Sequence, residues 1–211
     1  MIFALLPVKI LSNAKQRLAG HLTVSQRERL ARAMYEQTLA SLLQAQGIDR
    51  VVVVTGDAEA AEHARRSGVP VFEESEQLSH SVSADAACRR AMDQGATTAL
   101  LVPIDVPTAR PDDFQQLAAA ARPGVIIVPS ADGTGTNALV RTPPDVIESR
   151  FGTGSFKAHL DQARLKGVPA DVLRIPGLMF DIDTPEDVAE LLARAPDCHA
   201  ARFLQSACAS K

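Results

Sequence analysis

The stretch Arg50-Val51-Val52-Val53-Val54-Thr55 decides the fold class that the sequence predicts. Its uninterrupted run of β-branched residues is typical of a strand buried on both faces, as in a parallel sheet. Residues 58–67 have a helical pattern that ends at Gly68, and residues 69–72 are expected to form a further short strand. This strand–helix–strand order is the repeating unit of an α/β protein.

The same alternation of apolar runs and helical patterns continues through most of the chain. Strands are predicted at residues 1–8, 50–55, 69–72, 98–103, 125–128, 137–141, 170–174 and 179–182. Helices are predicted at residues 25–46, 58–67, 81–94, 111–122, 155–166 and 185–194. We therefore predict a three-layer α/β sandwich with a mostly parallel sheet, as a single domain over residues 1–195 with a C-terminal tail at 196–211. Ligands of such sheets bind beyond the C-terminal ends of the strands.

Three of the predicted helices begin with residues that favour helix N-termini. Thr23 is followed three positions later by Gln26, which is the spacing of a capping box. Thr184 is expected to cap the helix at 185–194, with Asp187 three residues on, and Ser155 is expected to cap the helix at 155–166.

Composition excludes several classes of protein. The chain has 211 residues, of which 46% are hydrophobic and 22% charged, as in an ordinary globular protein. Its net charge of −3 provides no broad basic field, so we expect no nucleic-acid partner. Cys88, Cys198 and Cys208 lack Cys-x-x-Cys spacing and are expected to be reduced thiols of a cytoplasmic protein. No apolar stretch reaches the roughly 20 residues of a membrane helix, so no membrane partner is expected.

Two short loops combine glycine with hydroxyl side chains. Asp132-Gly133-Thr134-Gly135-Thr136-Asn137 follows the strand at 125–128, and Phe151-Gly152-Thr153-Gly154-Ser155-Phe156 opens the helix at 155–166. Backbone N–H groups at such turns and at helix N-termini form concavities that suit a phosphate. Neither loop continues as a P-loop, and the second lacks the third glycine of the dinucleotide fingerprint. Each loop alone is also an ordinary turn, but together they indicate a protein that handles phosphate esters.

Carboxylates follow two of the predicted strands. Asp105 comes just after the strand at 98–103, and Asp181 and Asp183 are spaced by two at the strand predicted over 179–182, so they would point the same way. Carboxylates near phosphate loops are what Mg²⁺ needs, because magnesium is held by one or two carboxylates together with substrate phosphates. Two alternatives stay open, namely helix capping by Asp183 and a turn at Asp105.

Cations gather after the first strand. Lys9, Lys15 and Arg17 lie in a segment that would reach the ligand-binding edge of the sheet, where lysine and arginine can bind phosphate. A solvated loop is the alternative. The histidines have no metal-binding spacing, and no nucleophile elbow is present. His159 lies one turn after Ser155, but a packing or surface role is favoured for it, and Cys88 is expected to be buried.

In this order, the segments resemble the 2-phospho-L-lactate guanylyltransferase family, the CofC-type enzymes of coenzyme F-420 (deazaflavin) biosynthesis, over residues 1 to about 195. The resemblance rests on Pro7-Val8-Lys9, Ala14-Lys15-Gln16-Arg17-Leu18, Pro103-Ile104-Asp105-Val106-Pro107, the two glycine loops with His159, and Phe180-Asp181-Ile182-Asp183-Thr184-Pro185-Glu186-Asp187. It implies the fold of nucleotide-diphospho-sugar transferases. It also implies transfer of GMP from GTP to a small phosphorylated carboxylic acid, with release of pyrophosphate. The family's acceptors are 2-phospho-L-lactate, phosphoenolpyruvate and 3-phospho-D-glycerate.

The resemblance also implies roles for individual residues. Asp105, Asp181 and Asp183 would gather Mg²⁺. Lys9, Lys15 and Arg17 would face the GTP phosphates, and with Asp105 they form the catalytic set. The acceptor would be held by Thr136, Asn137, Gly152, Gly154 and Ser155.

One segment departs from the family pattern. The family often has Gly-Leu-Asn near the nucleotide site, where this chain has Leu78-Ser79-His80. His80 therefore either replaces the hydrogen bonds of the asparagine or changes the selectivity for the base. Two other functions stay open: a nucleotidyltransferase for a sugar phosphate or a molybdopterin-type acceptor, and a catalytically silent nucleotide-binding module. A homodimer is also left open.

Overall fold

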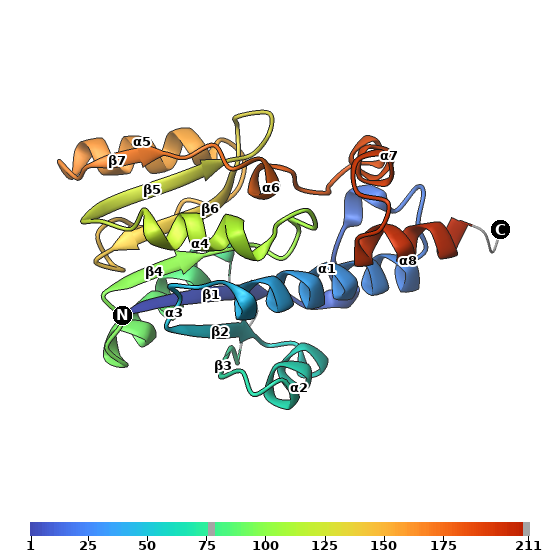
Figure 1. The fold of residues 1–211 in the computed structure, drawn as a ribbon, viewed down its shortest axis with the longest axis horizontal. Helices are drawn as coiled ribbons and strands as arrows, with labels where there is room; N and C mark the ends of the chain where they lie inside the picture. Colours follow the sequence, from blue (N-terminus) through green and yellow to red (C-terminus); the bar gives the residue numbers. More distant parts are fainter. Residues whose placement is uncertain (76–78, 209–211) are drawn as a thin grey trace.

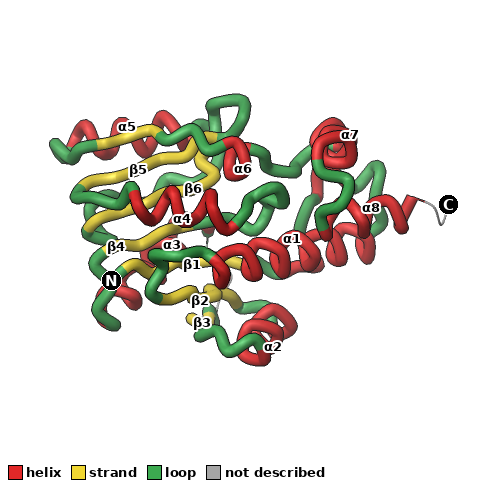
Figure 2. The backbone as a smooth tube through the Cα atoms, in the orientation of Figure 1, coloured by secondary structure: helices red, strands yellow, loops and turns green. Residues whose placement is uncertain are grey.

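In the computed structural model, which describes residues 1–75 and 79–208, a seven-stranded sheet forms the middle of the molecule (Figures 1 and 2). Its order is β3-β2-β1-β4-β6-β5-β7. The strands are β1 (Ile2–Val8), β2 (Arg50–Thr55), β3 (Val71–Glu73), β4 (Thr98–Leu101), β5 (Gly124–Pro129), β6 (Thr136–Thr142) and β7 (Ala170–Val172). β1 pairs in parallel with β2 and with β4, β2 with β3, and β5 with β7. β6 runs antiparallel to both of its neighbours, β4 and β5. The predicted sandwich with a mostly parallel sheet is confirmed.

Helices cover both faces of this sheet. The longer helices are α1 (Val24–Gln44), α2 (Ala58–Arg66), α3 (His80–Asp93), α4 (Pro111–Ala119), α5 (Ser155–Leu165), α7 (Pro185–Arg194) and α8 (His199–Cys208). Three short elements complete the set: the 3₁₀ turns η1 (Leu11–Asn13) and η2 (Gln16–Leu18), and α6 (Pro176–Met179). α1, α2, α4 and α6 pack on one face, and α3 and α5 pack on the other. None of the helices in the described residues is both long and apolar enough to span a bilayer.

Two capping predictions are confirmed and one is wrong. The capping boxes of Thr23 with Gln26 and of Thr184 with Asp187 are both formed. Ser155, however, is the first residue of α5, and the cap position is taken by Gly154. Gly154 has φ +72°, a left-handed conformation that glycine adopts without steric cost, so the chain enters the helix through a glycine turn without a capping side chain.

The strand predicted over residues 179–182 is also wrong. Pro176 opens the short helix α6, which ends at Met179, and the segment that follows is extended but lies outside the sheet. Apolar and acidic side chains alternate there as they would in a strand. Phe180 and Ile182 are buried in a cluster beside α1, and Asp181 and Asp183 face the other way. A hydrogen bond from Ile182 N to Asp105 O, 3.1 Å long, ties this segment to the one after β4.

The C-terminal segment contributes a helix to an additional hydrophobic cluster. α8 lies along the N-terminal half of α1 (Figure 1), and its Ala200, Ala201 and Leu204 are fully buried against Leu30 and Met34. The cluster also contains the buried apolar residues of η2 and α7. It therefore supports the loops that carry the cations after β1 and the aspartates before α7.

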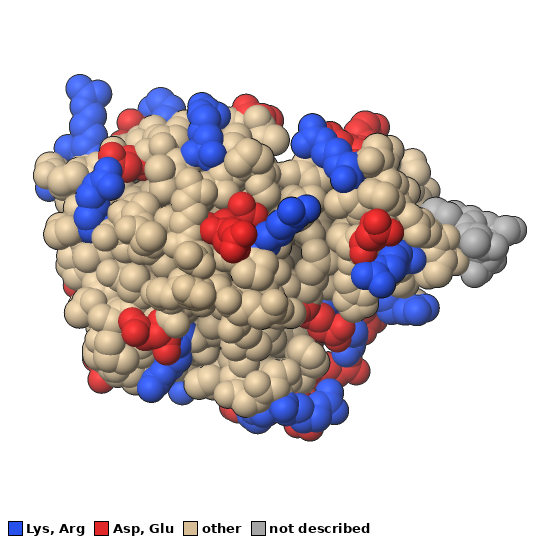
Figure 3. All heavy atoms as spheres, viewed as in Figure 1, with Lys and Arg blue, Asp and Glu red and all other residues tan. Residues whose placement is uncertain are grey.

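The outer face formed by α1 and α4 has charges of both signs. In Figure 3, lysine, arginine, aspartate and glutamate side chains are scattered over this face and separated by uncharged residues. No continuous basic stripe crosses the side that is shown, which agrees with the net charge of −3.

We expect Leu204→Ala to lower the free energy of unfolding by about 2–5 kcal/mol, because it opens a cavity in a cluster from which water is excluded. Leu165→Ala is the matched control, since Leu165 on α5 is 81% exposed and its truncation leaves no cavity. Urea denaturation of both variants checks this. Equal losses of stability would show that α8 does not contribute to the folded core.

Candidate active site

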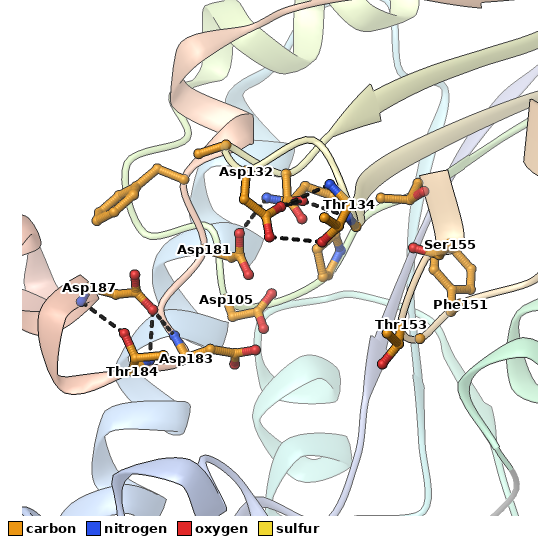
Figure 4. A pocket seen from close by; sticks show the side chains of 18 of the residues that line it. Asp105, Asp132, Thr134, Phe151, Thr153, Ser155, Asp181, Asp183, Thr184 and Asp187 are labelled. Atoms are coloured by element: carbon orange, nitrogen blue, oxygen red, sulfur yellow. Dashed lines mark hydrogen bonds between the residues drawn. The ribbon is translucent and has the colours of Figure 1, made fainter. Parts of the chain in front are cut away.

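A cavity of about 800 Å³ opens at the carboxyl ends of the central strands (Figure 4). Its wall is built from the segments after β4 and β5, the turn before α5, and the segment that leads into α7. The lining includes Arg17, His80, Asp105, Ser130, Asp132, Thr134, Thr136, Asn137, Gly152, Thr153, Ser155, Asp181, Asp183, Thr184, Asp187 and Glu190. Both glycine loops and all three predicted aspartates therefore face one space.

Lys15 joins two of these aspartates. Its Nζ lies 2.8 Å from Asp105 Oδ2 and 3.0 Å from Asp183 Oδ1, and its side chain is only 6% exposed. The more exposed Arg17 adds a 3.3 Å ion pair to Asp183. Lys15 adopts φ +53°, ψ +43°, which costs a residue with a Cβ on the order of 1 kcal/mol.

The charges in this cluster stabilise one another. Burial would lower the pKa of Lys15, but Asp105 and Asp183 together raise it above its usual 10.5. Burial would likewise raise the pKa of Asp105, but the ammonium group of Lys15 holds it below 3.8. Both groups are therefore ionised at neutral pH.

Asp181 forms no ion pair with a cation among the described residues. Its Oδ1 accepts a 3.0 Å hydrogen bond from Nδ2 of Asn137, which also donates to Met179 O. Burial, followed by the negative charges of Asp105 and Asp183, raises the pKa of Asp181. Among the described residues, no group of three or more acidic, histidine or cysteine side chains is already arranged as a metal site. Three carboxylates nevertheless face one cavity, and Lys15 pairs with two of them.

The first glycine loop is held in shape by Asp132. Its carboxylate accepts hydrogen bonds from Ser130 Oγ at 2.5 Å, Thr134 N at 2.9 Å and Thr134 Oγ1 at 2.8 Å. These bonds lower the pKa of Asp132 to about 2. Ser130 Oγ in turn accepts from Gly135 N at 2.7 Å. We did not select Asp132 as a site residue from the sequence, although it begins the motif, and in the structure it gives the loop a fixed conformation.

The second glycine loop turns the chain into α5. Gly152 and Gly154 have φ values of +121° and +72°, and Ser155 N donates to Gly152 O at 3.1 Å. In Figure 4 the Ser155 hydroxyl points towards the cavity from the start of the helix. Of the first N–H groups of α5, those of Phe156 and Ala158 also have partners, because they donate to Thr134 O and Gly154 O. The Ser155 hydroxyl is therefore the group that this turn offers to a ligand in the cavity.

His159 connects the two loops. It is fully buried, its Nδ1 lies 3.0 Å from Thr136 Oγ1, and its Nε2 accepts a 2.8 Å hydrogen bond from Arg150 N. The ring of Phe151 packs edge-on at 5.1 Å between centroids. Burial, followed by the positive charge of Arg141, lowers the pKa of His159 to about 4. The sequence indicated only a packing or surface role for His159. The feature that could have pointed to a place beside the site was its spacing of one helical turn from Ser155.

Lys9 lies apart from this cluster. Its Nζ is 3.2 Å from Glu74 Oε2 and also donates to Ser83 Oγ, and Lys9 is not part of the cavity wall described above. Of the three predicted cations, the structure thus brings Lys15 and Arg17 to the aspartates and pairs Lys9 with a different carboxylate. Contact of Lys9 with a nucleotide phosphate stays a prediction.

Part of the segment that departs from the family pattern is visible. Leu78 lies outside the described residues, Ser79 caps α3 by accepting a hydrogen bond from Val82 N, and His80 lines the cavity. Burial, followed by the charge of Lys9, lowers the pKa of His80, so that it is neutral at pH 7. Both cysteines whose side chains are described, Cys88 and Cys198, are free thiols, and Cys88 is buried as predicted.

An α/β sheet with carboxylates, cations and two glycine loops around one cavity at its carboxyl edge suits a nucleotidyltransferase, and the family model and the relatives place the chain in that class. The chain belongs to the family described as "Guanylyl transferase CofC like", whose model matches residues 2–210. It is therefore a guanylyltransferase by family, and the predicted resemblance is confirmed.

Relatives and solved structures agree with this assignment. The chain is 40% identical to the phosphoenolpyruvate guanylyltransferase of Sphaerobacter thermophilus, over 92% of this chain and 93% of that protein. It is 31% identical to the 2-phospho-L-lactate guanylyltransferase of Methanothermobacter thermautotrophicus, over 96% and 89% of the two chains. Its fold is similar to that of a protein from Desulfovibrio desulfuricans G20 assigned to the nucleotide-diphospho-sugar transferases, with a TM-score of 0.78 at 18% identity over 99% and 95% of the chains.

The depressed pKa of His159 predicts a pH-dependent loss of stability. Between its ordinary value of 6.5 and about 4, the unfolded chain binds a proton at this residue and the folded chain does not. The free energy of unfolding should therefore fall by about 3 kcal/mol through this residue as the pH drops from 6.5 towards 4. In His159→Asn that contribution is absent, so urea titrations at several pH values should give a shallower decline. Parallel declines in the two proteins would contradict the assignment.

Proposed function

We propose that this chain transfers GMP from GTP to phosphoenolpyruvate in coenzyme F-420 biosynthesis, with Mg²⁺ bound by its aspartates. The observation that carries the proposal is that Asp105 and Asp183, which Lys15 joins, line one cavity together with both glycine loops. The choice of acceptor is supported by the name of the 40% identical relative. The cytoplasm, where GTP and phospho-acids are made, is the location that we propose.

The reaction needs little acid–base chemistry. An oxygen of the acceptor phosphate forms a bond to the α-phosphorus of GTP, the bond to the bridging oxygen breaks, and pyrophosphate leaves with that electron pair. A phosphate monoester is already an anion at neutral pH, so no residue has to remove a proton from the nucleophile. The barrier comes from bringing two anions together and placing them in line, and fixed charges and dipoles lower that barrier.

The cations after β1 are suited to the donor. Arg17 lines the cavity, and Lys15 lies behind the wall, paired with two aspartates that line it. Both positive charges can attract the phosphates of GTP. Because Lys15 is already oriented by two carboxylates, its ammonium group needs little reorganisation when an anion approaches. Arg17, whose side chain is 72% exposed, is free to reach further into solvent.

The three aspartates fit a divalent cation. Carboxylate oxygens are its preferred ligands. The raised pKa of Asp181 reflects its burial and the negative charges of Asp105 and Asp183, with which Lys15 and Arg17 pair. Asp105, Asp181 and Asp183 would hold the ion, which when bound screens the phosphate charges of the substrates. Asn137 fixes Asp181 in place through its 3.0 Å hydrogen bond.

The acceptor fits the opposite side of the cavity. Thr136 at the start of β6 lines this side together with Gly152 and Ser155, and Gly154 is the cap residue of α5 between them. The loops are fixed by hydrogen bonds that their own N–H groups donate, so a small dianion would meet the hydroxyl groups of Thr136 and Ser155 on a preformed surface.

We expect Asp105→Asn and Asp183→Asn each to lower turnover at least about a hundredfold, because each removes a charge from the cation site. Pyrophosphate release from GTP and phosphoenolpyruvate measures this, and circular dichroism shows that each variant is folded. Asp171→Asn is the matched control, since Asp171 lies on the edge strand β7 and pairs with the exposed Arg122. Full activity in either cavity variant at saturating Mg²⁺ would refute the metal assignment.

Mass spectrometry of the product tests the acceptor. Incubation with GTP, Mg²⁺ and each of phosphoenolpyruvate, 2-phospho-L-lactate and 3-phospho-D-glycerate should give the guanylylated phosphoenolpyruvate at the highest rate. A higher rate with another phospho-acid would leave the guanylyltransferase activity supported and would identify that compound, in place of phosphoenolpyruvate, as the acceptor. Parallel reactions with ATP, CTP and UTP test the base selectivity at His80.

A further inference from the structure

His159 lies between the two loops that the proposed function assigns to the acceptor. It projects from the first turns of α5, its Nδ1 meets Thr136 at the start of β6, and its Nε2 meets the backbone of Arg150. The side chain is completely shielded from solvent. It therefore touches both loops and stands behind the wall of the cavity that Thr136 lines.

The hydrogen bonds determine which nitrogen carries the proton. The backbone N–H of Arg150 can only donate, so Nε2 must present its lone pair at 2.8 Å. A neutral imidazole has one N–H, which must then be at Nδ1 and donates to Thr136 Oγ1 at 3.0 Å. Burial and the nearby Arg141 both favour this neutral form.

The Arg150 N–H is itself held in position by the preceding segment. Asp85 on α3 accepts from Ser149 N at 3.1 Å, from Ser149 Oγ at 2.8 Å and from the buried Arg141 at 2.7 Å. Arg141 also donates to Ile147 O at 2.7 Å. The donor that selects the histidine tautomer is therefore part of a rigid network and not of a free loop.

This arrangement orients the Thr136 hydroxyl. Because Oγ1 accepts from His159, its own hydrogen is left to donate, and within the described residues no acceptor is recorded for it. Thr136 is 8% exposed and lines the cavity, so an acceptor for this hydrogen can come from a ligand there.

We propose that His159 is a positioning residue that, by donating to Thr136, makes the Thr136 hydroxyl a hydrogen-bond donor to an anionic oxygen of the phospho-acid. This rests on the proposed function in one respect, namely that the phospho-acid occupies the side of the cavity lined by Thr136. His159 does not contact the substrate, and the reaction transfers no proton through it.

Two amide variants separate the two nitrogens of the ring. In His159→Asn the side-chain amide nitrogen can take the position of Nδ1 and keep the bond to Thr136. In His159→Gln the side-chain oxygen can take the position of Nε2 and keep the bond from Arg150 N, but the donor to Thr136 is lost. The two variants are similar in chemistry and opposite in the contact that they keep.

The direct measurement is the Kd for phosphoenolpyruvate, by calorimetry without GTP, together with the two KM values in turnover. We expect His159→Gln to raise the phosphoenolpyruvate Kd and KM about tenfold or more, as for loss of a hydrogen bond to a charged group, with the GTP KM little changed. His159→Asn should restore most of the affinity. In a Thr136→Val background the difference between the two amide variants should disappear, because the hydroxyl is absent.

Thr136→Ser and Thr136→Val carry the same test if His159→Gln does not fold: serine should keep the affinity and valine should lose it. Equal weakening by asparagine and glutamine, or a change only in thermal stability and GTP KM, would reduce His159 to a packing residue and overturn the proposal. Failure of wild type to bind any of the three phospho-acids would overturn it as well. Binding of a phospho-acid without GMP transfer would instead refute the proposed function and leave the histidine comparison valid through Kd.

Discussion

The contact of Lys15 with Asp105 and Asp183 is the interaction on which the rest of the site depends. It brings together the loop after β1, the segment after β4 and the segment before α7. Asp105 and Asp183 lie 90 and 168 residues after Lys15 in the sequence. An isolated carboxylate pair at this edge would repel itself, and an isolated buried ammonium group would lose its proton. Each charge persists because the others are present, and removal of one carboxylate would leave the buried ammonium group of Lys15 with less compensation.

The two sides of the cavity differ in the kind of electrostatic interaction that they offer a ligand. On the donor side, three aspartates lie close to Lys15 and Arg17, and Asp181 is not paired with either of these cations. This arrangement suits binding of a polyphosphate with a divalent cation. On the acceptor side, the two loops present the hydroxyl groups of Thr136 and Ser155 to the cavity and have no basic side chain of their own. A small anion placed there meets hydroxyl dipoles, and the nearby Asp132 carboxylate is engaged by three hydrogen bonds within its own loop.

Neutral histidine suits this second side for the same reason. A charged imidazolium between the loops would repel Arg141 and would oppose the Arg150 N–H with a second donor. The neutral ring instead links a fixed donor in one loop to a hydroxyl in the other. The polar network around Asp85 thus reaches the cavity through His159 without placing a charge in the cavity wall.

The sequence by itself determined the α/β class, most of the helices and strands, the two loops and the identity of the charged residues. These are local properties: β-branched runs, helical periodicity, capping boxes and glycine turns depend on neighbours within a few positions. The strand predicted at residues 179–182 was wrong. Apolar and acidic side chains alternate there as in a strand, but the apolar ones pack in a cluster beside α1. Only the tertiary structure decided that Lys15 would pair with Asp105 and Asp183, that Lys9 would pair with Glu74, and that His159 would join both loops. Those contacts span large separations in sequence, and burial and partner charge, which fix their protonation, exist only after the chain has folded.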